Sequence, residues 1–125
     1  MVRTEHLLFE NQELLNHARN LLLRINPDID SAQYVQARYS ELFSVLYRAF
    51  DDVRVRLLDI PSDELIPTEP NSIETFGRDS AEVSRKAESF RETNPFIGAN
   101  RACRLAIRDF TFYKSQIEAL RFAAK

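Results

Sequence analysis

Histidine and cysteine are the side chains most often used as metal ligands, general bases and nucleophiles, and this chain has two histidines and one cysteine. His6 and His17 are eleven residues apart in the sequence, or about 16 Å along a helix, so one metal ion cannot bind both. Glu10 and Glu13 lie near His17, but a spacing of four replaces the Glu-x-x-His of carboxylate-bridged di-iron bundles. We interpret them as helix-stabilising pairs and expect no metal site.

Cys103 is the strongest candidate for a nucleophile, since no serine has a histidine near it in the sequence to form a catalytic pair. It lies on the apolar stripe of the last expected helix, whereas a catalytic thiolate needs a partly exposed, cationic setting. We therefore expect a buried structural cysteine, no catalytic residue and no cofactor. One cysteine also excludes an intramolecular disulfide. These observations predict that the protein is not an enzyme.

The side of the last expected helix that lies opposite its apolar stripe combines arginines with apolar residues. Arginine and phenylalanine are common anchors of protein interfaces. If this helix is instead central in the fold, the same residues belong to a wide apolar arc that touches two neighbouring helices. Both interpretations stay open, and the hypothesis of a partner-binding surface assigns the contacts to Arg104, Leu105, Arg108, Phe112 and Phe122.

Four helices are expected to position these side chains, over about 4–25, 31–58, from 72 through Phe90, and 95–124. Apolar residues recur at spacings of three and four in each segment, which is typical of one buried helix face. Thr4 can cap the first helix, and Asp30 with Gln33 has the spacing of a capping box at the second. Gly77 weakens the third segment, because glycine costs up to about 1 kcal/mol inside a helix.

The segment 59–70 joins the two halves of the chain and contains three prolines and four acidic residues without a cation. Proline and acidic residues at this density indicate a surface loop. Short loops on either side of it favour antiparallel helix neighbours. The sequence therefore predicts an all-α, up-and-down antiparallel bundle of four helices, built as two helical hairpins joined by this acidic loop. At 125 residues, it predicts one domain over 1–125.

Charge and hydropathy predict where in the cell the protein is located. The net charge is −2, and the sequence has no apolar run long enough for a secretory signal or a membrane span. A single cysteine fits a reducing compartment. We therefore expect a cytoplasmic protein without a membrane partner. The two longest expected helices would overhang the others by about 10 Å, which favours a homo-oligomer or a subunit of a larger assembly.

Together these features predict a non-enzymatic protein–protein interaction module, such as an adaptor, an assembly factor or a small inhibitor of a larger complex. The alternative is a nucleic-acid-binding regulatory protein that uses Arg101, Arg104 and Arg108. The negative net charge disfavours that alternative, because phosphate binding usually requires an excess of lysine and arginine.

Overall fold

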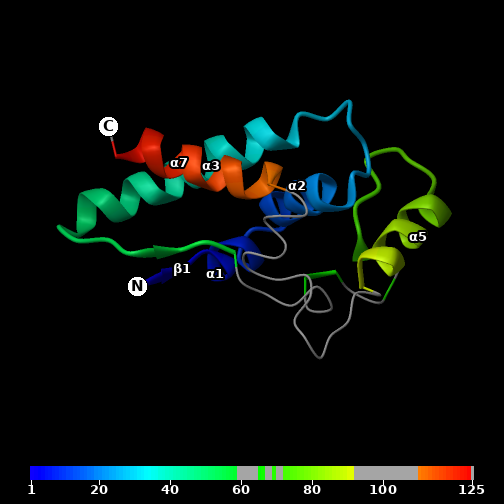
Figure 1. The fold of residues 1–125 in the computed structure, drawn as a ribbon, viewed down its shortest axis with the longest axis horizontal. Helices are drawn as coiled ribbons and strands as arrows, with labels where there is room; N and C mark the ends of the chain where they lie inside the picture. Colours follow the sequence, from blue (N-terminus) through cyan, green and yellow to red (C-terminus); the bar gives the residue numbers. More distant parts are fainter. Residues whose placement is uncertain (59–64, 67–68, 70–71, 92–109, 125) are drawn as a thin grey trace.

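The computed structural model of the chain describes residues 1–58, 65–66, 69, 72–91 and 110–124. These residues are mostly helical, as the sequence predicts, and none of their helices is long and apolar enough to cross a membrane. Helices α3 and α7 lie side by side across the top of Figure 1, with the two strands and α1 below them and α5 at the right. In chain order the elements are β1 (Val2–Arg3), α1 (Thr4–Phe9), α2 (Gln12–Leu23), α3 (Ser31–Ala49), β2 (Val55–Arg56), α5 (Ser80–Arg91) and α7 (Thr111–Ala123).

The first predicted helix, over 4–25, is two helices in the structure. Asn11 has extended backbone angles (φ −128°, ψ 101°), and its side chain accepts a hydrogen bond of 3.1 Å from the Leu14 N–H. An asparagine with this geometry caps the helix that follows it, so the preceding helix has to end. Thr4 does not cap α1 as predicted, because Arg3 is the N-cap and Thr4 is buried inside the helix.

Helix α3 begins as predicted and ends earlier. The Asp30 side chain accepts a hydrogen bond of 3.1 Å from the Gln33 N–H. The helix stops at Ala49 rather than near 58, because Phe50 takes extended backbone angles (φ −134°, ψ 141°). The apolar positions beyond it belong to an extended segment that leads into β2.

The two strands form a parallel pair in which Val2 lies opposite Val55 and Arg3 lies opposite Arg56. Parallel strands need a long crossover connection, and helices α1, α2 and α3 provide it. The predicted up-and-down bundle of four helices is therefore not confirmed. The chain is a mostly helical structure with a small parallel sheet.

The third predicted helix, which was to begin near 72, begins at Ser80. Phe76 (φ 50°) and Gly77 (φ 83°) both have left-handed backbone angles, which end any right-handed helix. Gly77 thus lies in a turn before α5, and it does not destabilise the interior of a helix as the sequence predicted. The apolar face of α5 is buried as its periodicity predicts, at Val83, Ala87 and Phe90.

Helix α7 packs on α3 through aromatic rings. The Tyr39 ring meets Phe112 edge-on at 6.3 Å between centroids and stacks on Phe43 at 5.4 Å. The buried face of α7 follows Phe112, Gln116 and Ala119, which are all 0% exposed. Apolar spacing in the sequence placed Phe110 and Tyr113 on one stripe of this helix, and Tyr113 is buried whereas Phe110 is 53% exposed. Gln116 was not expected in the core because its side chain is polar.

Phe112 should therefore be essential for stability rather than for binding a partner. We expect Phe112→Ala to lower the free energy of unfolding by about 3–5 kcal/mol, through lost burial and the cavity that remains. Phe50→Ala is the matched control, because that ring is 60% exposed, and its effect should stay within about 0.5 kcal/mol. Urea unfolding followed by circular dichroism measures both values. Equal effects of the two substitutions would contradict the burial of Phe112.

Candidate functional site

The two strands each end in an arginine. Arg3 is the last residue of β1, Arg56 is the last residue of β2, and the parallel register places one opposite the other. Neighbouring strands run about 4.8 Å apart, and residues in register point to the same face of a sheet. Two arginine side chains therefore leave neighbouring strand ends on the same face of the sheet.

Glu5, in the first turn of α1, makes an ion pair with Arg56. The Glu5 side chain is only 10% exposed and that of Arg56 is 34% exposed. The second carboxylate oxygen of Glu5 has no hydrogen-bond partner among the described residues. Arg3 is exposed. These three side chains together carry one net positive charge, which favours an anionic ligand.

The backbone that follows each strand is held by buried polar side chains. The Thr4 hydroxyl donates to the Arg56 carbonyl at 2.9 Å, and the Tyr39 hydroxyl donates to the Thr4 carbonyl at 3.3 Å. The Leu58 N–H donates to Gln116 Oε1 at 3.2 Å, and the Tyr113 hydroxyl donates to the Leu58 carbonyl at 2.9 Å. Helices α3 and α7 therefore set the position of the residues around both arginines.

His17 lies in a second polar cluster, between α2 and α3. Its Nδ1 is 2.9 Å from the Ser31 Oγ, and its ring stacks on Tyr34 with 4.1 Å between centroids. Asn20 donates to the same Ser31 oxygen at 2.7 Å, so the Ser31 hydroxyl can donate to a neutral imidazole. The sequence did not predict this serine–histidine contact. Ser31 is 1% exposed and has no access to a substrate, so the pair joins two helices and is not a catalytic pair.

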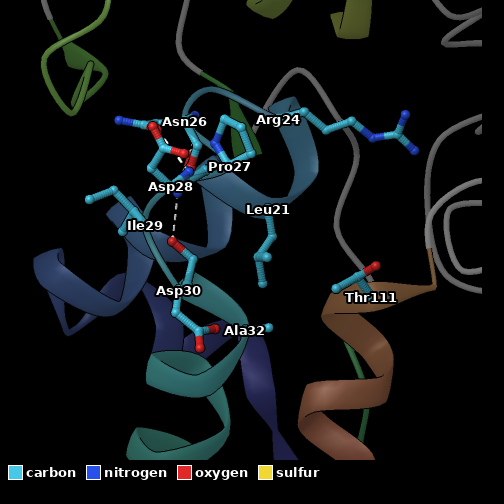
Figure 2. A pocket seen from close by; sticks show the side chains of 11 residues that line it. Leu21, Arg24, Asn26, Pro27, Asp28, Ile29, Asp30, Ala32 and Thr111 are labelled. Atoms are coloured by element: carbon cyan, nitrogen blue, oxygen red, sulfur yellow. Dashed lines mark hydrogen bonds between the residues drawn. The ribbon is translucent and has the colours of Figure 1, made fainter.

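A surface hollow of about 480 Å³ lies beside the loop between α2 and α3, with Thr111 on its far side (Figure 2). The polar groups of this loop are used to build the loop itself. Asn26 accepts a hydrogen bond from the Asp28 N–H at 3.0 Å, and Asp30 caps α3. In Figure 2 the Arg24 side chain extends away from Leu21 and Asp30. The hollow therefore presents no converging set of ligand-binding groups.

Arg19 is a buried cation, 6% exposed, that sequence reasoning did not single out. Its Nε donates to the Leu65 carbonyl at 3.0 Å, and its Nη1 lies 3.4 Å from the Ser72 carbonyl. Burial lowers the pKa of this guanidinium. Arg19 holds Leu65, within the acidic segment 59–70, and Ser72, just after it, against α2, which is a structural role.

The residues predicted to bind a partner fall into three groups. Arg104, Leu105 and Arg108 lie outside the described residues, as do Arg101 and Cys103. Phe112 is fully buried and belongs to the core, because α7 turns that side toward α3, while Phe122 is 54% exposed. In the part of the chain that the structure describes, no three metal-ligating side chains come together.

Comparison with known proteins identifies the family. The sequence profile of the PEP-utilising enzymes, PEP-binding domain, matches residues 1–125, which is the whole chain. The chain belongs to this family. Because this is an enzyme family, the prediction that the protein is not an enzyme is wrong. The predicted protein-interaction function and its nucleic-acid alternative are overturned by the same finding.

The relatives of this member of the PEP-utilising enzymes are much longer proteins. The pyruvate, phosphate dikinase of Clostridium symbiosum is 32% identical over 137 residues, which cover 99% of this chain and 15% of that protein. The pyruvate, phosphate dikinase of Rickettsia conorii is 30% identical over 130 residues, 96% of this chain and 14% of that protein. The chloroplastic pyruvate, phosphate dikinase of Flaveria pringlei is 29% identical over 135 residues, 99% of this chain and 14% of that protein. The chain thus spans about one seventh of the length of these relatives, and no solved structure matches it significantly.

Sequence reasoning did not single out this arginine pair, because Arg56 was placed inside the helix expected over 31–58 and Arg3 lies just before the first expected helix. One signal was available in the sequence. From Val53 to Leu57 the residues alternate between apolar side chains and arginine, which is the period of a strand rather than a helix. Val53 and Leu57 also continue the helical spacing of α3, and that longer pattern was preferred.

The His17 cluster predicts that stability depends on pH. Burial lowers the pKa of His17 below its ordinary value of 6.5, and the Glu13 carboxylate offsets this effect only in part. The folded state therefore binds fewer protons than the unfolded state, and its stability falls as the pH drops below about 6.5 toward the lower pKa of the folded protein. We expect urea unfolding at pH 7.5 and pH 5.5 to show this loss in the native chain and a smaller loss in His17→Gln.

His6→Gln is the control for this measurement, because it removes the exposed histidine instead. It should keep the full loss of stability between the two pH values. A His17→Gln chain with the same pH dependence as the native chain would show that another group is responsible.

Proposed function

We propose that Arg3 and Arg56 form a binding site for phosphoenolpyruvate in this chain. The observation that supports the proposal best is the parallel register, which places one arginine at the carboxyl end of each of two neighbouring strands. Proteins with parallel strands commonly bind their ligands at the carboxyl ends of those strands. Membership of a family described as PEP-binding agrees with this ligand.

The chemistry of the ligand fits the two side chains. Phosphoenolpyruvate carries a phosphate and a carboxylate on one small carbon skeleton, so that two anionic groups lie close together. The planar guanidinium group can donate two parallel hydrogen bonds to either of them. Two adjacent arginines can therefore bind both ends of one ligand. A single glutamate beside them leaves the positive charge in excess.

Glu5 gives the site its preformed shape. Its ion pair holds Arg56 at the edge of the core, while Arg3 remains exposed. A guanidinium that is already oriented loses less conformational freedom when it binds a ligand. In this arrangement Arg56 provides a fixed anchor and Arg3 can close over the ligand from the neighbouring strand.

We further propose that the chain contributes to phosphoryl transfer as part of an enzyme. The names of its relatives indicate that they act on pyruvate and phosphate. Phosphoenolpyruvate is the phosphorylated enol form of pyruvate. One site can therefore bind phosphoenolpyruvate before phosphoryl transfer and pyruvate after it, or the reverse. Arginines next to a phosphoryl group stabilise the charge that develops during transfer. The described residues thus supply ligand binding and charge stabilisation.

The proposal predicts a specific loss of binding. We expect Arg3→Met to weaken the binding of phosphoenolpyruvate about 10- to 100-fold, since a hydrogen bond to a charged group contributes about 1.5–3 kcal/mol. Arg56→Met should have an effect of the same size when it is combined with Glu5→Gln. The second change is needed because removal of Arg56 alone would leave the buried Glu5 without its partner. Isothermal titration calorimetry with phosphoenolpyruvate measures the affinities.

Two controls accompany these variants. Arg85→Met removes one exposed positive charge on α5, which lies at the opposite end of the molecule from the strands (Figure 1), and should not change the affinity. Glu5→Gln alone shows the effect of the second change by itself. Native affinity in a folded Arg3→Met chain and in the folded double variant would refute the proposed site.

A further inference from the structure

The three residues from Arg56 to Leu58 are held by side chains from outside the sheet. Thr4 donates to the Arg56 carbonyl at 2.9 Å, and α7 bonds both the backbone N–H and the backbone carbonyl of Leu58. The Leu58 N–H donates to Gln116, and the Leu58 carbonyl accepts from Tyr113. The short segment that begins with Arg56 is thus fixed at three backbone atoms.

Gln116 is an unusual residue for its position. It is 0% exposed and occupies the middle of the apolar face with which α7 packs on α3. Burial of an amide is unfavourable unless the amide is hydrogen-bonded, so an apolar residue would ordinarily fit better there. The amide nitrogen of Gln116 has no hydrogen-bond partner among the described residues, and the structure shows what the amide oxygen does. It accepts the Leu58 N–H, which lies beyond the end of the strand pair.

Gln116 also connects the ends of the two strands. Its side chain lies beside the Tyr39 hydroxyl, which donates to the Thr4 carbonyl directly after β1. One buried cluster therefore contacts the backbone next to Arg3 and the backbone two residues after Arg56. A change in this cluster would alter the relative position of the two arginines.

We propose that Gln116 is a positioning residue, which holds the Arg56–Leu58 backbone so that Arg56 and Arg3 point at the same ligand. This inference rests on the proposed phosphoenolpyruvate site. Gln116 itself lies in the core and does not touch the ligand. Its side-chain oxygen fixes the Leu58 peptide, the peptide fixes the backbone direction at Arg56, and the guanidinium is oriented before the ligand arrives.

Two substitutions of Gln116 separate positioning from packing. Gln116→Met keeps the length of the side chain and removes the oxygen that accepts the Leu58 N–H. Gln116→Glu keeps an oxygen at that point but buries a carboxyl group, which is itself unfavourable. If Gln116 only fills the core, the less stable variant should also bind phosphoenolpyruvate more weakly. If Gln116 positions Arg56, the variant that keeps a side-chain oxygen, Gln116→Glu, should bind phosphoenolpyruvate more tightly than Gln116→Met.

We expect Gln116→Met to bind phosphoenolpyruvate at least about tenfold more weakly than the native chain, since small misplacements of a binding group have large effects. Gln116→Glu should restore affinity to within about twofold of the native value. Calorimetry is done at a temperature at which urea titrations show every variant to be folded. Phe112→Leu is the structural control, because it changes the same buried face without removing a contact to the Leu58 peptide.

A second measurement reports on the backbone without any ligand. The Leu58 amide proton should exchange with solvent faster in Gln116→Met and at the native rate in Gln116→Glu, as followed by NMR. Equal affinities of the native chain and Gln116→Met, or an unchanged Leu58 exchange rate, would overturn the positioning role alone. A native chain that does not bind phosphoenolpyruvate would overturn the proposed site and this inference with it.

Discussion

The small sheet depends on buried hydrogen bonds from the helices that cover it. Two strands of two residues form few ladder hydrogen bonds, and an isolated two-stranded unit is marginal in water. Tyr39 of α3 and Tyr113 and Gln116 of α7 bond the backbone that follows the strands. Because these donors and acceptors are buried, leaving any one of them unpaired is costly. The strands therefore keep one position relative to the helices.

The aromatic core gives these polar groups their fixed positions. Tyr39 stacks on Phe43 and meets Phe112 edge-on, so its hydroxyl is aimed at the Thr4 carbonyl by the packing of its ring. The packing of α3 on α7 thus has two functions. It buries the apolar surface that stabilises the chain, and it orients the polar tips of the same residues toward the strand ends.

The arginine pair combines a partly buried, ion-paired cation and an exposed cation. Arg56 is held by a mostly buried glutamate and by a backbone fixed on both sides, whereas Arg3 is exposed on the neighbouring strand. This asymmetry suits the ligand with two anionic groups that we propose. Arg56 can bind one group first, and Arg3 can then enclose the second. The chain covers about one seventh of the length of its dikinase relatives.

The sequence by itself determined the features that depend on local interactions. The start of α3 follows from Asp30, whose carboxylate caps the helix, and the buried face of α5 follows from the spacing of Val83, Ala87 and Phe90. The mostly helical character follows from the same periodicity. Caps and apolar stripes act over three or four residues, so they can be recognised without a partner.

Only the tertiary structure decided which residues form the site. Fifty-two residues of sequence separate Thr4 from Arg56, and each strand is too short to carry a clear signal of its own. Val53 and Leu57 fit both a helix and a strand, and the choice depends on β1, which lies far away in the sequence. Gln116 was not predicted as a core residue for a similar reason. Its buried amide oxygen accepts a hydrogen bond from the Leu58 N–H, which is distant in the sequence. The pairing of Arg3 with Arg56 is therefore a property of the fold and not of any local pattern.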